Sequence, residues 1–307
     1  MILLIEQLLN GLQLGIFLFL LSAGLTLIFG IMGVINLAHG SLYMVGAYAA
    51  ALGMQWTGSF WWGLLLALPA SAFTGLLVEL VIIRQLYRRD HLDQVLATFG
   101  LILFLNESTT IWFGRAPLFL SLPETLSVSV EILPGLPYPL YRLLIIGVGL
   151  LLAFFLYLLI THTRAGMLLR AGTTHQEMVE ALGVNLTLLN TGLFMLGALL
   201  AGFAGALAGP LISVEVGMGE NVLILCFVCI VIGGLGSIRG ALVGALLIGM
   251  VDTLGRAFLS SGLRLILQPD FADSIGAALS SMSVYLLMAL VLIFRPQGIL
   301  PVVIRAR

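Results

Sequence analysis

Residues 7–78 read QLLNGLQLGIFLFLLSAGLTLIFGIMGVINLAHGSLYMVGAYAAALGMQWTGSFWWGLLLALPASAFTGLLV, a stretch without any Asp, Glu, Lys or Arg. A soluble domain of this length needs charged residues where its surface meets water. A bilayer instead accepts about 20 apolar residues per helical crossing, and a central Arg or Asp costs roughly 2.5 to 3.5 kcal/mol on insertion scales. The stretch therefore predicts several crossings joined by short turns, and the chain is expected to be an all-α polytopic membrane protein.

The whole chain has the composition of a membrane protein, because 61% of its residues are hydrophobic, 9% are charged and the mean hydropathy is +1.17. Charge-poor windows give nine candidate spans: 10–31, 34–53, 61–83, 94–113, 142–162, 188–212, 222–236, 240–256 and 277–295. Three windows are short or interrupted by polar residues or glycine, and such segments often form broken or re-entrant helices. We therefore expect about eight or nine transmembrane helices in a single transmembrane domain, residues 1–307.

The distribution of Arg predicts how the chain is oriented, since cytoplasmic loops carry an excess of basic residues. Three Arg-rich regions fall on one side when the windows are threaded in order, and they contain Arg84, Arg88, Arg89, Arg164, Arg170, Arg295, Arg305 and Arg307. This side is assigned to the cytoplasm, with the C-terminus. The opposite loops are 114–141, 213–221 and 257–276. The loop 114–141 contains five prolines and is predicted to be an extended periplasmic loop with a short strand or turn.

Residue usage excludes several functions. All 13 basic residues are Arg, so the chain lacks the Lys that a nucleotide-binding P-loop requires. Energy for uphill transport must therefore come from another subunit or from an ion gradient. A net charge of −1 provides no basic patch for nucleic acid.

The residue types that perform catalysis or hold metals are scattered. No H-E-x-x-H, G-x-S-x-G or paired intramembrane Asp occurs, and the four His residues lie far apart in the sequence. Cys226 and Cys229 lie in an apolar window and are interpreted as small residues of a buried helix. We expect no catalytic residues, no metal and no cofactor in this chain, so an intramembrane enzyme is disfavoured.

Small residues recur at helical spacing in two rows. Gly197, Ala201, Gly205 and Gly209 form one row, and Gly236, Gly240 and Gly244 form another. Such rows let helix backbones approach closely. They serve either static packing or the shearing of helices during a transport cycle.

A polar signature, GVINLAHGS at 33–41, interrupts the second window. Asn36 and His39 are three residues apart and would share one face of a helix, where an unpaired polar group inside a bilayer is costly. Two interpretations stay open. Asn36 caps or bridges helices while His39 holds a backbone carbonyl, or both residues line a translocation path or gate. The other candidates for this path or gate are Gly40, Ser41, Gly236 and Gly240.

The cytoplasmic segment 161–188, THTRAGMLLRAGTTHQEMVEALGVNLTL, lies between two long apolar windows. Thr173 or Thr174 is expected to cap a short amphipathic helix that Gly183 ends. A helix this short is not stable alone, and it lacks the basic face of helices that lie on membranes. We therefore predict that the loop 163–187 docks on a partner.

Three blocks of the chain resemble one family, the high-affinity branched-chain amino acid permeases of the LivH type. The stretch Gly33–Gly40, followed by Tyr43-Met-x-Gly-Ala47, resembles the family's N-terminal signature. The sequence VIGGLGSIRGA at 231–241 resembles its glycine-rich block, and PQGIL at 296–300 resembles its C-terminal end. Together with a fourth motif, at 177–185, these blocks extend the resemblance over residues 8–301. Ser41 stands where many relatives carry Glu.

The cytoplasmic segment resembles the coupling helix of bacterial ABC-importer permeases, through the pattern E-x-x-x-x-L-G-x-N from Glu177 to Asn185. The usual E-A-A core reads here Glu180-Ala-Leu-Gly183. This resemblance implies a surface that contacts an ATPase, formed by Thr174, Glu177, Glu180, Ala181, Gly183 and Asn185.

The resemblance also implies an assembly and a place in the cell. The expected partners are a second, LivM-like permease subunit, two cytoplasmic ATP-binding-cassette ATPases that bind the ATP, and a periplasmic solute-binding protein. The expected location is the bacterial inner membrane, in contact with lipid. The chain itself would be a transport subunit rather than an enzyme, and its substrate would be leucine, isoleucine, valine or a related small polar solute.

Other transport functions remain open at the level of sequence. Permeases of the same family also carry urea or short amides. An ion-coupled secondary transporter would need intramembrane carboxylates, and Glu79, Glu107 and Asp252 are the candidates. A channel would have no evident use for the docking helix.

Overall fold

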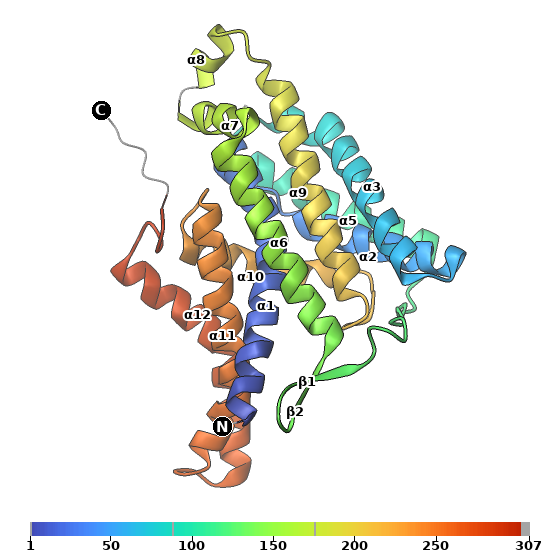
Figure 1. Ribbon diagram of the computed structural model, residues 1–307. Coiled ribbons are helices and arrows are strands. Elements are labelled where there is room, and N and C mark those ends of the chain that lie inside the picture. Colours follow the sequence, from blue (N-terminus) through green and yellow to red (C-terminus); the bar gives the residue numbers. More distant parts are fainter. Residues whose placement is uncertain (1, 88, 175, 302–307) are drawn as a thin grey trace. The chain divides into compact units, whose positions relative to one another are not determined.

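The computed structural model describes residues 2–87, 89–174 and 176–301, and for residues 170, 172–174, 176, 177 and 180 it describes the backbone only. Long helices account for most of this part of the chain (Figure 1). The elements in order are α1 (Ile2–Leu27), the π-helix η1 (Ile28–Met32), α2 (His39–Thr57), α3 (Phe60–Val78), the π-helix η2 (Glu79–Ile83), α4 (Arg84–Leu86), α5 (His91–Phe113), β1 (Ser129–Leu133), β2 (Leu136–Pro139), α6 (Leu140–His162), α7 (Arg164–Thr174), α8 (Gln176–Ala181), α9 (Leu186–Ala208), α10 (Met218–Gly233), α11 (Ile238–Leu263) and α12 (Pro269–Phe294).

Each of the nine predicted windows coincides with one long helix, which confirms an all-α polytopic membrane protein. In the described residues, seven helical stretches are long and apolar enough to cross a membrane. The two other windows correspond to α2 and to the shorter apolar helix α10. These are two of the windows that the sequence marked as interrupted or short.

The prediction of a loop at 257–276 is largely wrong, because α11 continues to Leu263 and α12 already begins at Pro269. The prediction ended the preceding span at the charge of Arg256. In the structure, Arg256 Nε donates to Asp252 one turn earlier, at 2.9 Å from Oδ2. A charge paired on its own helix does not end that helix, so α11 continues beyond Arg256.

The described residues divide into two compact units. One unit comprises residues 2–19, 124–151 and 226–301, and the other comprises 20–123 and 152–225. The helices α1, α6 and α10 each contribute residues to both units.

In the unit that contains α2, α3 and α9, these three helices pack on one another through small residues (Figure 1). A methyl group on Gly46 of α2 would overlap the backbone of Gly202 in α9, and a methyl group on Gly202 would overlap Ser71 of α3. A methyl group on Gly205 would overlap the carbonyl oxygen of Tyr43. The close backbone approach that the row of small residues in α9 predicts is therefore confirmed.

In the other unit, α11 packs against α1 and α12. A methyl group on Gly249 of α11 would overlap the backbone of Gly11 and Gly15 in α1. A methyl group on Gly276 of α12 would overlap the side chain of Ser260. Small residues again set the distance between helices.

The predicted short strand in the loop 114–141 is confirmed as an antiparallel hairpin of β1 and β2, with Val130 opposite Tyr138. Hydrogen bonds tie its second strand to α1, because Asn10 Oδ1 accepts from the hydroxyl of Tyr138 at 3.1 Å and from Nη1 of Arg142 at 2.5 Å. Burial raises the pKa of Tyr138, so its hydroxyl remains a donor at neutral pH.

Within the unit of α2, α3 and α9, contacts between loops show which loops lie at the same end of the helices. Leu118 and Val214 exchange two backbone hydrogen bonds of 2.9 Å, which joins the loop after α5 to the loop after α9. Nη2 of Arg84 lies 2.9 Å from the Thr191 hydroxyl, which joins the Arg-rich turn to the start of α9. This is the grouping that the distribution of Arg predicts.

Replacing Gly46 by Ala is expected to destabilise the protein by about 1 to 3 kcal/mol, because the new methyl group meets backbone atoms that have no room to move. The control is Gly192→Ala in α9, where a methyl group meets open space and Ala is the better helix former by up to about 1 kcal/mol. Thermal denaturation of the two variants in detergent should lower the midpoint for Gly46→Ala only. Equal midpoints would contradict the close packing of α2 on α9.

Candidate coupling and translocation site

The segment 163–187 forms two helices, α7 and α8, which directly precede the first turn of α9 (Figure 1). Thr173 and Thr174 lie in the last turn of α7, so the prediction that one of them starts the short helix is wrong. The helical pattern extends further back than expected, because residues 164–171 contain no strong helix breaker besides Gly166. The side chains of Thr174, Glu177 and Glu180 lie outside the described residues.

Gly183 ends the short helix, as predicted. Its φ of +83° is a conformation that favours glycine. The N–H of Leu182 donates to the carbonyl of Met178 at 3.1 Å, and the N–H of Val184 donates to the carbonyl of Val179 at 3.3 Å. Asn185 then begins α9, because its side chain accepts from the N–H of Leu188 at 3.1 Å. The turn from α8 into α9 is therefore closely defined.

Apolar side chains are exposed along this segment. Val179 is buried, whereas Met178 is 62% exposed and Leu182 is 78% exposed. Ala181 and Asn185 are also exposed. One face of α8 thus packs inward, and its other face presents large apolar groups of the kind that interfaces bury.

The polar signature at 33–41 forms a break between helices. The π-helix η1 precedes Gly33, which has a φ of +66°, and α2 begins only at His39. Asn36 and His39 therefore do not share a helical face, contrary to the prediction. The side-chain oxygen Oδ1 of Asn36 accepts a hydrogen bond from the N–H of Ala38 at 3.0 Å. Nε2 of His39 lies 3.2 Å from the carbonyl oxygen of Leu21.

His39 holds a backbone carbonyl, as the first of the two interpretations expects. The other half of that interpretation is wrong, because the N-cap of α2 is Ala38 and the Asn36 side chain bonds within its own turn instead of capping or bridging helices. Both side chains are fully buried, and Asn36 Nδ2 and His39 Nδ1 have no hydrogen-bond partner among the described residues. Ser41 is buried in α2, and a methyl group on Gly40 would overlap the carbonyl of Gly219. A role of these residues in a path or gate remains a prediction.

The sequence analysis missed Gln94 and Thr98, which hold the break from α5. Gln94 Oε1 accepts from the N–H of Ile35 at 3.0 Å, and its Nε2 donates to the carbonyls of Leu86 and Arg89 at 3.2 Å each. Thr98 Oγ1 accepts from the N–H of Leu37 at 3.3 Å. The available signal was two polar residues four apart in an apolar window, which places both on one helix face.

Gly236 lies in the tight turn between α10 and α11, and Gly240 lies in the first turn of α11. Gly236 has a φ of +79°, Ser237 caps α11 by accepting from the N–H of Gly240 at 3.0 Å, and a methyl group on Gly240 would overlap the carbonyl of Gly233. The N–H groups of Ile299 and Leu300 donate to carbonyls of α10 at 2.9 Å. The glycine-rich block and the C-terminal PQGIL motif are thus one packed structure.

A pocket of about 520 Å³ opens beside α4 and the first turns of α5. It is lined by Gln85, Leu86, Arg89, Asp93, Leu96 and Ala97. None of the predicted path residues lines this pocket. Within the residues that the structure describes, no three His, Cys, Asp or Glu side chains lie close enough together to hold a metal ion.

Residues 7–294 match the family described as "Branched-chain amino acid transport system / permease component". The chain is 31% identical to the high-affinity branched-chain amino acid transport system permease protein BraD of Pseudomonas aeruginosa, over 96% of this chain and 95% of BraD. It is 28% identical to LivH of Salmonella typhimurium, over 96% and 95% of the two chains. It is also 28% identical to LivM of the same organism, over 92% of this chain and 67% of LivM.

The chain therefore belongs to this family of transport-system permease components, and it is a multi-pass membrane protein. The resemblance read from the motifs is confirmed. No solved structure matches the chain.

Replacing Gln94 by Leu is expected to cost about 1 to 3 kcal/mol, because the buried groups that Gln94 satisfies would lose their partners. Gln85→Leu is the matched control, since Gln85 is exposed and its side chain donates only to the carbonyl of Val81; a surface change of this kind shifts stability by about 0.5 kcal/mol or less. Thermal denaturation in detergent should lower the midpoint of the Gln94→Leu variant and leave that of the Gln85→Leu variant close to the wild type. Similar midpoints for both variants would show that Gln94 does not stabilise the break.

Proposed function

We propose that this chain is the membrane-spanning permease subunit of an ABC importer that carries leucine, isoleucine and valine. The observation that carries the proposal is the similarity over 96% of the chain to BraD, which is named as a permease of a branched-chain amino acid system. The match extends through all four motifs, so the whole fold is shared rather than one segment.

The proposed assembly contains a second, LivM-like permease, two cytoplasmic ATPases that bind and hydrolyse ATP, and a periplasmic binding protein that delivers the amino acid. Similarity to both LivH and LivM of one organism supports pairing of two related permeases. The missing Lys supports ATP hydrolysis in other subunits. The proposed location is the bacterial inner membrane, with the C-terminus in the cytoplasm.

Residues 163–187, which we call the coupling segment, are proposed to form the docking surface for an ATPase. Its core is α8 and the turn at Gly183, with Thr174, Glu177, Glu180, Ala181 and Asn185 at the contact. The exposed apolar side chains of Met178 and Leu182 support this role, because a partner that covers them gains hydrophobic stabilisation. Closure of the two ATPases would push α8, and the turn into α9 would pass the displacement to the membrane helices.

The translocation path or gate is proposed to include Asn36, His39, Gly40 and Ser41, with Gly236 and Gly240 at a second position. Broken helices often line substrate paths in transporters, because their free backbone groups can meet a polar solute. Asn36 Nδ2 and His39 Nδ1 are buried without a hydrogen-bond partner among the described residues, which supports a polar site at this break. No cofactor is proposed for this chain.

An ion-coupled mechanism is disfavoured by two ion pairs. Glu79 pairs with Arg84 at 3.0 Å, and Asp252 pairs with Arg256 at 2.9 Å. A carboxylate that is already bonded to a guanidinium is not free to bind a coupling ion. Transport of urea or a short amide remains the alternative within the same family.

Uptake assays in right-side-out membrane vesicles decide among these functions. Vesicles that hold the complete complex, with leucine-loaded binding protein outside, should take up radiolabelled leucine only when ATP is enclosed in the lumen, and an uncoupler should leave the uptake unchanged. Loss of uptake on adding the uncoupler would favour the ion-coupled alternative. Uptake of urea, with leucine neither transported nor competing, would favour the amide alternative.

Gly183→Ala is expected to abolish the stimulation of ATP hydrolysis by leucine-loaded binding protein, because Ala disfavours a φ of +83° by about 1 to 2 kcal/mol and so distorts the turn from α8 into α9. The measurement uses the complex reconstituted in nanodiscs. The control is Gly58→Ala, between α2 and α3, where φ is +68° and the added methyl group also meets open space. Equal stimulation in both variants would contradict the assignment of the coupling segment.

A further inference from the structure

Glu79 is the most deeply buried carboxylate of the described residues, with a side chain that is 0% exposed. Arg84 donates to both of its oxygens, from Nε to Oε1 at 3.2 Å and from Nη2 to Oε2 at 3.0 Å. The hydroxyl of Tyr87 donates to Oε1 at 2.6 Å. The hydroxyl of Thr191 lies 3.0 Å from Oε2. We call these four residues the Glu79 cluster.

The local helix geometry explains why Glu79 and Arg84 meet. Residues five apart lie on different faces of an α-helix, which repeats every 3.6 residues. Residues 79–83 form the π-helix η2, whose i→i+5 bonding brings such residues over one another. Burial raises the pKa of Tyr87, with its hydrogen bond to Glu79 as a second cause, so this hydroxyl stays protonated and donates.

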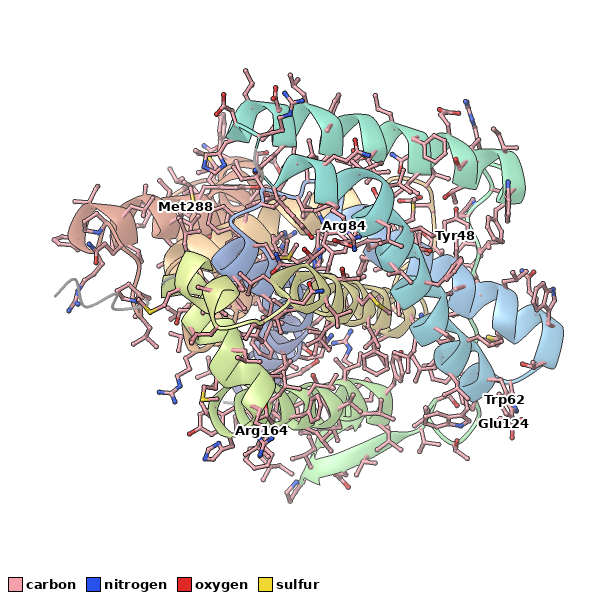
Figure 2. All side chains as sticks on the ribbon, turned by 90° about the horizontal axis from the view of Figure 1, so that it is seen from above. Tyr48, Trp62, Arg84, Glu124, Arg164 and Met288 are labelled. Carbon is pink, nitrogen blue, oxygen red and sulfur yellow. The ribbon has the colours of Figure 1, made fainter. Side chains whose placement is uncertain are left out.

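The cluster joins two elements that are far apart in the sequence. Glu79 begins η2, which continues from α3, Arg84 begins α4 and Tyr87 follows it, whereas Thr191 lies in the second turn of α9. Nη2 of Arg84 also lies 2.9 Å from the Thr191 hydroxyl. In Figure 2, Arg84 lies on the side of α4 that faces α9. Few residues separate this contact from Asn185, where α9 leaves the coupling segment.

The remaining contacts between α3 and α9 differ in kind. Farther along these helices, Ser71 of α3 packs on Gly202 of α9 through van der Waals contact. Contacts between small side chains lack directional bonds, so packed helices can slide along them. Charge-assisted hydrogen bonds to a buried carboxylate are directional and costly to break. The Glu79 cluster therefore fixes the register of α9 against α3.

We propose that the Glu79 cluster is the linkage that makes the first turns of α9 move together with α3 when the coupling segment is displaced. Glu79 and Thr191 are positioning residues in this proposal, which rests on the proposed ABC-importer function. Displacement of α8 reaches α9 through the Gly183 turn and reaches α3 through the cluster. The small-residue contacts of α2 with α3 and α9 then carry the movement to the polar break at Asn36.

The test measures leucine taken up per ATP hydrolysed by the complete complex in proteoliposomes, with loaded binding protein. Glu79→Gln keeps the shape of the side chain but turns an amide donor towards the donors Arg84 and Tyr87. Its uptake per ATP should fall by about tenfold, which lies within the usual range of coupling between sites. Asp252→Asn is the control, because it makes the same change in an ion pair of α11. Its ratio should equal that of the wild type.

A second pair of variants acts on α9 alone, in case Glu79→Gln does not assemble. Thr191→Val removes the hydroxyl that reaches Glu79 and keeps the size of the side chain, so uptake per ATP should fall. Thr191→Ser restores the hydroxyl and should restore the ratio. A lower thermal midpoint with an unchanged ratio in both Glu79→Gln and Thr191→Val would overturn the proposal, since it is what a purely structural role produces. An unchanged ratio in Thr191→Val alone, where Glu79→Gln fails to assemble, would overturn it as well.

The failure of this proposal is distinguishable from failure of the proposed function. A wild-type complex that takes up no leucine with ATP overturns the proposed function. A wild-type complex that does take up leucine, with variants of normal ratio, overturns only the linkage through Glu79.

Discussion

The hydrocarbon core of a membrane provides no water, so every polar group of a crossing chain must find its partner within the protein. This constraint explains the long uninterrupted helices, which satisfy their own backbone. It also explains why the departures from helix carry most of the polar side chains discussed here. At the break before α2, Gln94 and Thr98 satisfy the N–H groups of Ile35 and Leu37. Where η2 widens the helix, Arg84, Tyr87 and Thr191 satisfy Glu79.

The same constraint decided what could be predicted from the sequence. Charges are costly in the bilayer, so charge-poor windows marked the long helices, and the glycine at 183 marked the end of α8. The prediction failed at Arg256, because a charge that is paired one turn away no longer ends a helix. It failed again at Asn36 and His39, where helical spacing was assumed across a stretch that Gly33 and the π-helix η1 interrupt.

The contacts that the sequence did not predict are those between distant segments. Glu79 and Thr191 are 112 residues apart, and Glu79 and Arg84 have a spacing that α-helical periodicity does not pair. A π-helix has no reliable sequence signal, so the i,i+5 pair was not expected. The contact of the PQGIL motif with the α10–α11 turn was missed for a similar reason, because each motif was considered alone. In both cases the individual residues or motifs could be recognised in the sequence, but only the tertiary structure shows that they are in contact.

In the proposed importer, a chain that lacks a nucleotide-binding motif would depend on mechanical connection to the subunit that hydrolyses ATP. Helices packed through glycine and alanine approach closely, yet contacts of this kind resist sliding poorly. A displacement applied at the start of α9 would then be lost as slip between α9 and α3. A directional contact near the point of application prevents this slip at the least cost, because it need not be repeated along the helices. The Glu79 cluster lies at such a point, in the second turn of α9. Glu79 and Thr191 are buried, so little water competes at the carboxylate, whereas the Arg84 side chain is 39% exposed.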